Sequence, residues 1–159
     1  MHAHRHVRVY GICVSDDKAL VIRKNAGPYR GRYDLPGGSL EPDESLVAAL
    51  RREFEEEVGM TPSSLKLIGA RDLFVRWVRP DYTHEQHIAL FYEVSVKTEA
   101  WREIPSFDGQ DSDGFSWVPV TELSPHNSSP LVLQAIQWLN DGEIPADPKH
   151  YDEWVILGG

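Results

Sequence analysis

The spacing of apolar residues predicts two amphipathic helices in this chain. The first is predicted at residues 44–58, where apolar side chains recur at helical spacing and form one stripe: Leu46, Val47, Leu50, Phe54 and Val58. Asp43 is its predicted N-cap, because a short acidic side chain can accept an amide hydrogen bond from the first turn, and Gly59 is its predicted C-terminal stop. The second helix is predicted at residues 130–140, with Pro130 in its first turn and Gly142 beyond its end.

Segments rich in β-branched and apolar residues predict strands at 7–14, 19–23, 65–78, 87–96 and 114–118. The first two flank a short polar turn and are expected to pair as a hairpin. The third, interrupted at residues 69–72, and the fourth are joined by a polar turn at 79–84 and are expected to form a second hairpin. This order of hairpins and helices favours an α/β (α+β) fold in which helices cover a mixed sheet.

Composition indicates a single soluble domain over residues 1–159, with 41% hydrophobic and 26% charged residues. The net charge of −9 argues against binding to a nucleic-acid backbone, which requires a basic surface. No apolar run approaches the ~18 residues of a membrane span. Cys13, the single cysteine, excludes an internal disulfide and lies in an apolar run, so a buried structural thiol and a cytoplasmic location are expected.

Three glutamates give the first helix its candidate chemistry. Glu53, Glu56 and Glu57 stand at i, i+3 and i+4, so their side chains should converge beside the apolar stripe. Like charges at this spacing destabilise an isolated helix by roughly 0.2–0.5 kcal/mol per pair. The cluster therefore raises the question of what lies between the three carboxylates. A solvated helix face is one interpretation. The other is a site for a hard divalent cation such as Mg²⁺, which takes oxygen ligands together with substrate phosphates.

The stretch from Gly38 to Met60 favours the second interpretation, because it resembles the Nudix box of the Nudix hydrolase family. That motif is a glycine, five residues, a glutamate, seven residues, and then Arg-Glu-apolar-any-Glu-Glu-any-Gly-apolar. All fixed positions match: Gly38, Glu44, Arg52, Glu53, Phe54, Glu56, Glu57, Gly59 and Met60. The resemblance implies an α/β/α sandwich with a mixed β-sheet between helices.

The resemblance also implies an activity, which is the metal-dependent hydrolysis of a nucleoside diphosphate linked to another group. Mg²⁺ or Mn²⁺ would be held by Glu53, Glu56 and Glu57, and the carbonyl of Gly37 would be a further ligand. Arg52 would hold a carboxylate in place through its guanidinium group, and Glu44 is expected to pair with it.

Family members often take one more carboxylate from a later loop, as a metal ligand or as the base. Asp111 is the leading candidate here, together with Asp113, and Glu103 and Asp108 stand behind them. The alternative for each is an ordinary acidic residue on a loop surface.

The substrate is expected to be a small nucleotide, with a nucleoside triphosphate or a related compound as the lead. Arg23 and Arg32, in a locally basic segment, are candidates for contact with its phosphates or base, and Trp77 for stacking on the base. Other aromatic residues that could stack, or lie in the core instead, are Tyr29, Tyr82 and Phe91. An ADP-ribose or nucleotide-sugar pyrophosphatase and a non-catalytic nucleotide-sensing module are the alternative functions.

Both ends of the chain allow more than one interpretation. The alternating histidines His2, His4 and His6 could form a metal site, but a frayed lead-in to the first strand or an expression remnant is favoured. The apolar residues at 154–157 are expected to pack on the domain or on a second subunit, which leaves a homodimer open.

Overall fold

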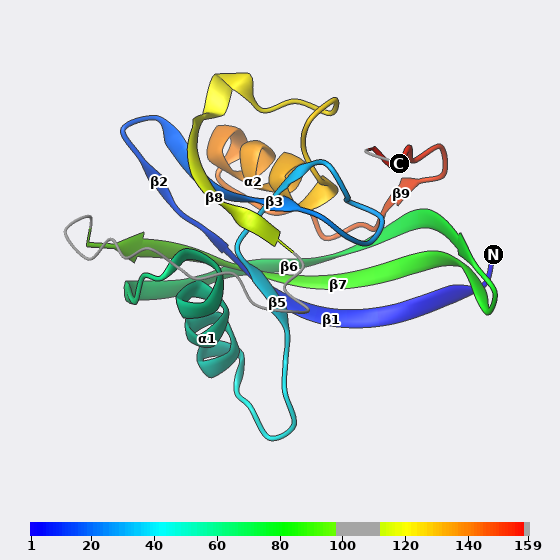
Figure 1. The fold of residues 1–159 in the computed structure, drawn as a ribbon, viewed down its shortest axis with the longest axis horizontal. Coiled ribbons are helices and arrows are strands. Elements are labelled where there is room, and N and C mark those ends of the chain that lie inside the picture. The colour runs from blue at the N-terminus through cyan, green and yellow to red at the C-terminus, as the bar shows by residue number, and fades with distance from the viewer. Residues whose placement is uncertain (98–111, 158–159) are drawn as a thin grey trace.

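A computed structural model describes residues 1–97 and 112–157 of the chain (Figure 1). Its α-helices are α1 (Leu46–Val58) and α2 (Pro130–Asp141). Its strands are β1 (Ala3–Ile12), β2 (Val14–Ser15), β3 (Lys18–Lys24), β4 (Tyr33–Asp34), β5 (Gly37–Ser39), β6 (Pro62–Arg79), β7 (Tyr82–Val96), β8 (Ser112–Pro119) and β9 (Lys149–Tyr151). A short 3₁₀ helix, Val120–Glu122, follows β8. The predicted α+β class is confirmed.

A five-stranded mixed sheet forms the centre of the fold, with strand order β5-β1-β7-β6-β9. β6 and β7 form the predicted second hairpin, although β6 passes residues 69–72 as a continuous strand with a bulge between Leu67 and Gly69. The predicted first hairpin is wrong for most of its length. β1 pairs with β7 in parallel and with β5 in antiparallel fashion, and this long-range pairing buries both faces of its last residues, Val9 to Ile12.

A second sheet of four strands lies over one face of the first, so the predicted single sheet is in fact two (Figure 1). The turn of its β2–β3 hairpin holds Asp16 and Asp17 at positive φ, which acidic residues tolerate better than most. β3 also pairs with β4 and β8. Cys13 stands where the chain leaves β1 and enters β2, and it is buried as predicted.

The two helices lie on opposite sides of the long sheet (Figure 1). Alternate residues of β1 divide between two cores, with Tyr10 and Ile12 on the α2 side and Val9 on the α1 side. From α1, the buried apolar residues are Ala49, Leu50, Phe54 and Val58. Val47 was predicted to belong to this stripe, but its side chain is 40% exposed because it lies at the stripe's outer edge.

The N-cap of α1 lies two residues later than the sequence predicted. Ser45 is the N-cap, and its hydroxyl accepts a hydrogen bond from the amide of Ala48. Asp43 instead adopts a left-handed conformation in the preceding turn, with φ of 62°. The predicted C-terminal stop at Gly59 is confirmed, since it adopts a left-handed conformation. α2 begins and ends as predicted to within a residue, with Ser129 as its N-cap.

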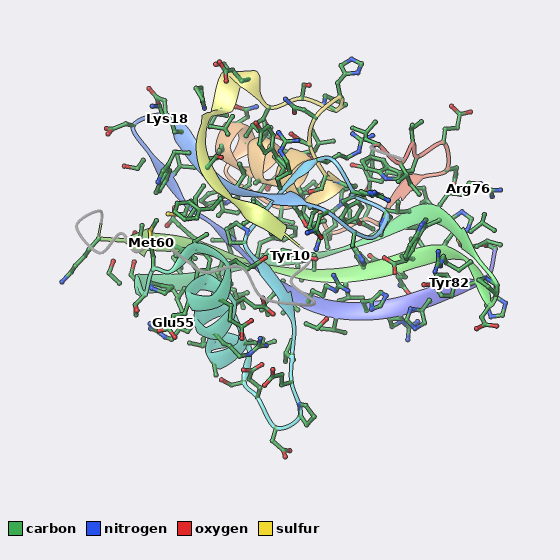
Figure 2. The ribbon with its side chains drawn as sticks, viewed as in Figure 1. Tyr10, Lys18, Glu55, Met60, Arg76 and Tyr82 are labelled. Atoms are coloured by element: carbon green, nitrogen blue, oxygen red, sulfur yellow. The ribbon has the colours of Figure 1, made fainter. Side chains whose placement is uncertain are left out.

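The N-terminal histidine segment is ordered in the fold, so a frayed lead-in is wrong. Ala3 to His6 belong to β1 and pair with β7, which itself begins at Tyr82 inside the predicted polar turn. Figure 2 shows Tyr82 near this end of the sheet, well removed from Glu55 on α1. At the other terminus, Trp154 packs on the α2-side core and donates a hydrogen bond to the carbonyl of Pro28 (2.7 Å). No helix in the described part of the chain is both long and apolar enough to cross a membrane.

Candidate functional site

Arg52 organises the carboxylates at the exposed side of α1. Its Nε and Nη2 atoms donate to the two oxygens of Glu44 at 2.8 and 2.9 Å, a bidentate pair. The remaining nitrogen, Nη1, lies 3.1 Å from Glu53 Oε1 and 3.4 Å from Glu56 Oε2. Nη2 also donates to the carbonyl of Ser39 in β5 (3.0 Å). One guanidinium group therefore fixes two of the three candidate ligands against the edge of the sheet.

The third candidate ligand, Glu57, is held from the sheet side. It is only 6% exposed, and its Oε1 accepts a hydrogen bond from the amide of Gly37 at 2.8 Å. Gly37 has φ of 150°, and a Cβ at this position would lie 2.0 Å from the carbonyl oxygen of Val9, so only glycine fits here. The strand β5 thus approaches α1 closely enough for its backbone to orient a carboxylate.

The same close approach means that a side chain on Gly38 would displace the carboxylate of Glu53. A Cβ on Gly38 would lie 2.5 Å from Glu53 Oε1. The donors gathered here are carboxylate oxygens on one helix face beside a glycine backbone, the ligand type that Mg²⁺ and Mn²⁺ take. The residues present therefore fit a hard divalent cation.

Glu44 gives a pH-dependent test of the Arg52 arrangement. Hydrogen bonds from Arg52 and from the amide of Glu41 lower the pKa of Glu44 from 4.5 to about 2. A depressed carboxylate pKa stabilises the fold above the ordinary pKa, and the stabilisation disappears as the pH falls towards the folded-state value. We therefore expect Glu44→Gln to melt below the parent protein near neutral pH. The difference between the two melting temperatures should shrink between pH 4.5 and 2. A difference independent of pH would mean that Glu44 acts through packing instead of charge.

A pocket of about 240 Å³ lies on the other face of the long sheet. Its functional side chains come from β1, β3, the loop after β3, β6 and β7: Arg8, Lys24, Tyr29, Trp77, Glu85 and His87. Arg8 projects on the same face as Tyr10, away from α1. In the β1–β5 register Arg8 stands opposite Ser39, whose carbonyl accepts from Arg52. The register therefore brings one pocket residue, Arg8, next to the strand that contacts Arg52, although Arg8 projects on the opposite face from α1.

Charges inside this pocket are arranged for a polar ligand. Burial alone would lower the pKa of Arg8, but Tyr10 and Glu85 outweigh it and raise the pKa. Burial alone would also raise the pKa of Glu85, yet contacts with His87 and His6 hold it below its ordinary value. Within the described residues, the buried Nε of Arg8 has no hydrogen-bond partner. An acceptor group on a bound ligand would satisfy this donor.

Of the three predicted substrate contacts, one lines the pocket and two do not. Trp77 lines the pocket, half-buried, with Arg79 stacked over its ring at 4.7 Å. Arg32 is 4% exposed and donates hydrogen bonds to the carbonyls of Pro125 (2.7 Å) and Val155 (2.8 Å). It therefore holds the C-terminal segment in place and does not line the pocket. Arg23 is exposed, donates to the carbonyl of Gly31 at 3.2 Å and also lies outside the pocket lining.

Several pocket residues were not predicted from the sequence. Arg8, Glu85 and His87 are the charged or titratable ones, together with Lys24, which follows the predicted contact Arg23 in the sequence. Arg8 alternates with apolar residues on β1, whereas Glu85 and His87 belong to a polar run at the start of β7, and only the pairing of these strands brings them together. Tyr29 lines the pocket, Tyr82 lies near its sequence neighbour Trp77 in space, and Phe91 is a core residue with no exposure.

The later-loop carboxylates fall mostly on residues that the structure does not describe. Asp111, Glu103 and Asp108 lie outside the described ranges. Asp113 belongs to β8, which pairs with β3 beside the pocket residue Lys24.

Comparison with known proteins places the chain in a family. The profile of the NUDIX domain matches residues 3–139. An ADP-ribose pyrophosphatase of Methanocaldococcus jannaschii is 38% identical over 69 residues, 43% of this chain and 41% of that protein. This chain thus aligns with less than half the length of that relative. Phosphatase NudJ of Escherichia coli K12 is 28% identical over 140 residues, 87% of this chain and 85% of NudJ.

Solved structures agree with the profile at the level of the fold. A MutT protein from Bacillus halodurans superposes with a TM-score of 0.68 at 19% identity, covering 96% of this chain and 94% of that one. The family predicted from the box is confirmed by the profile match. The chain belongs to the NUDIX domain family.

Proposed function

We propose that the chain is a metal-dependent hydrolase that cleaves the pyrophosphate linkage of a nucleoside diphosphate derivative. The observation that carries this proposal is the arrangement around Arg52, which gathers Glu53 and Glu56 on one side of α1 while Gly37 holds Glu57. A solvated acidic face would need neither the buried Glu57 nor a backbone amide aimed at it.

Each residue has a distinct role in the proposed reaction. Glu53, Glu56 and Glu57 would hold Mg²⁺ or Mn²⁺, with the carbonyl of Gly37 as a further ligand. Such an ion, when bound, neutralises charge on the pyrophosphate and lowers the pKa of a coordinated water. Arg52 orients two carboxylates, and its own pKa is raised, chiefly by the hydrogen bonds to Glu44. One glutamate, or the predicted Asp111, would orient the attacking water.

The pocket supports a small nucleotide as the substrate. Its volume of about 240 Å³ is below the 300–1,000 Å³ typical of sites that enclose a whole drug-sized ligand, so it suits one ring system of a larger molecule. Trp77 offers an aromatic face to such a ring. Arg8 and Lys24 offer positive charge to an acceptor or phosphate, while Glu85 can accept from a base amine or a ribose hydroxyl.

A nucleoside triphosphate or a related nucleotide is the lead substrate within this class. ADP-ribose is the competing one, because the relative from Methanocaldococcus jannaschii is named for it. Both share a nucleoside diphosphate group, and they differ in what is attached to its outer phosphate. The pocket would bind a ring of the part that both share, so it does not favour either one, and the hydrolysis panel must distinguish them.

A hydrolysis panel tests the proposal directly. The full chain would be incubated with nucleoside triphosphates, ADP-ribose, nucleotide sugars, NADH and dinucleoside polyphosphates, each with Mg²⁺ or Mn²⁺, and the products identified. We expect one class to be hydrolysed clearly faster than the rest, with cleavage inside a pyrophosphate group and no turnover in excess chelator. Binding of a nucleotide without turnover would instead support the non-catalytic sensing module.

A further inference from the structure

Three ligand atoms converge at the end of the long sheet where β1 begins. His4 Nδ1 lies 3.0 Å from His6 Nε2, and His6 Nε2 lies 2.9 Å from Glu85 Oε1. All three atoms lie within 4.8 Å of one another. The parallel register of β1 and β7 sets His4 opposite Glu85, and alternation along each strand turns these side chains to the same face. Backbone pairing therefore fixes the cluster before any ligand arrives.

Hydrogen bonds among the three side chains do not satisfy all three atoms at once. His6 Nε2 contacts both of the others, and one ring nitrogen carries at most one proton. If that nitrogen is protonated, Glu85 and His4 must share a single hydrogen. If it is not protonated, its lone pair faces a carboxylate oxygen. A cation in contact with all three atoms would take a lone pair from each, which removes the conflict.

The spacing is close to that of a metal's coordination shell. Two ligands that each lie about 2.0–2.1 Å from a tetrahedral zinc ion are about 3.3–3.4 Å from one another. The two contacts in the cluster are 3.0 and 2.9 Å, so these atoms would move apart by a few tenths of an ångström to admit the ion. Two imidazoles and one carboxylate are a ligand set that Zn²⁺ takes in proteins, and imidazole suits transition metals better than Mg²⁺.

A second layer of side chains supports the carboxylate. The other oxygen of Glu85, Oε2, lies at an ion-pair distance of 2.9 Å from His87 Nε2, without the geometry of a hydrogen bond, and His87 Nδ1 lies 2.7 Å from the hydroxyl of Tyr29. His87 and Tyr29 are 1% and 2% exposed, so their positions are fixed by packing. Partners of this kind orient metal ligands, and losing one typically costs 10–100-fold in affinity.

We propose that His4, His6 and Glu85 form a binding site for a divalent transition-metal ion, with Zn²⁺ as the best match. The site is separate from the carboxylates of α1. His4 stacks on Tyr82 with ring centroids 4.8 Å apart, and Figure 2 shows Tyr82 at the opposite end of the sheet from Glu55 of α1. Because Glu85 and His87 also line the pocket, an ion here would fix one wall of that pocket.

Titration of the full chain with Zn²⁺ in excess Mg²⁺ tests this proposal, since Mg²⁺ competes at the carboxylates of α1 and poorly at imidazoles. The bound Zn²⁺ would be measured by competition with a chromophoric chelator. We expect one Zn²⁺ per chain, and an affinity reduced by at least about 100-fold in the double variant His4→Gln/His6→Gln. Glu85→Gln should weaken binding by at least about 10-fold, because it removes the negative ligand.

Three control variants separate this site from other sources of Zn²⁺ binding. His126→Gln replaces an exposed histidine far along the chain, His2→Gln tests chelation by the N-terminus, and Glu56→Gln tests the carboxylates of α1. All three should bind Zn²⁺ as the parent does. The proposal fails if the double variant binds as tightly as the parent, if His2→Gln or Glu56→Gln abolishes binding, or if the parent takes up no Zn²⁺. Circular dichroism of each variant checks that it remains folded.

Discussion

Glu56→Gln is expected to reduce metal-dependent turnover by more than about 100-fold while leaving the fold intact. Loss of a residue that merely orients a metal ligand typically costs 10–100-fold, so loss of a ligand itself should cost more. Glutamine keeps the size of the side chain and removes its charge. The Glu56 side chain is 44% exposed, and its contact with Arg52 is the longest of that guanidinium's hydrogen bonds, so folding should not depend on it. Steady-state kinetics on the preferred substrate, with the melting temperature of each protein, measure both effects.

Glu55→Gln is the matched control for this experiment. Glu55 is the immediate neighbour in α1, carries the same charge and is exposed, but it accepts a hydrogen bond from Thr61 Oγ1 and is not among the hydrogen-bond partners of Arg52 within the described residues. This variant should retain turnover close to that of the parent protein. Equal losses in Glu55→Gln and Glu56→Gln would point to net charge on the helix, and near-normal activity in Glu56→Gln would remove Glu56 from the site.

The chemistry of α1 could be predicted because it depends on local spacing. Residues at i, i+3 and i+4 share a helix face whatever the rest of the chain does, so the positions of Glu53, Glu56 and Glu57 followed from the helix alone. The pairing of Glu44 with Arg52 was also anticipated, and the structure confirms it as a bidentate contact. Local periodicity did not predict which residues beside the apolar stripe are buried and which are exposed. Glu57 is buried and Val47 is exposed, because the backbone of β5 approaches one edge of the helix.

The pocket could not be predicted, because it depends on pairings between distant parts of the chain. Glu85 reaches His6 only through the parallel contact of β1 with β7, across 79 residues of sequence. A hairpin between the first two strands was the locally simpler arrangement, and it left the N-terminal histidines without a partner. Arg32 shows the converse case. It stands in a basic segment, as a phosphate contact should, but its guanidinium group donates hydrogen bonds to backbone carbonyls of segments far away in the sequence.

Phe54 is the largest of the buried side chains that hold the carboxylate-bearing helix on the sheet. Phe54 has no exposed surface and belongs to the core between α1 and the long sheet. The ring lies directly against Gly11 of β1, where an added Cβ would be 2.5 Å from Phe54 Cε2. A glycine in the strand therefore lets the helix pack closely, and the ring fills the space that the missing side chain leaves.

Phe54→Ala is therefore expected to lower the free energy of unfolding by about 3–5 kcal/mol, the cost of replacing a fully buried aromatic ring by a methyl group. Urea denaturation followed by circular dichroism would measure it, with the m-value compared between variants. Val47→Ala is the control, since Val47 lies on the same helix and in the same predicted stripe but is 40% exposed. Its effect should stay within about 0.5 kcal/mol, as for most surface substitutions. Equal losses in the two variants would mean that α1 packs on the sheet by a different face from the one described, and the placement of Glu53, Glu56 and Glu57 would then change with it.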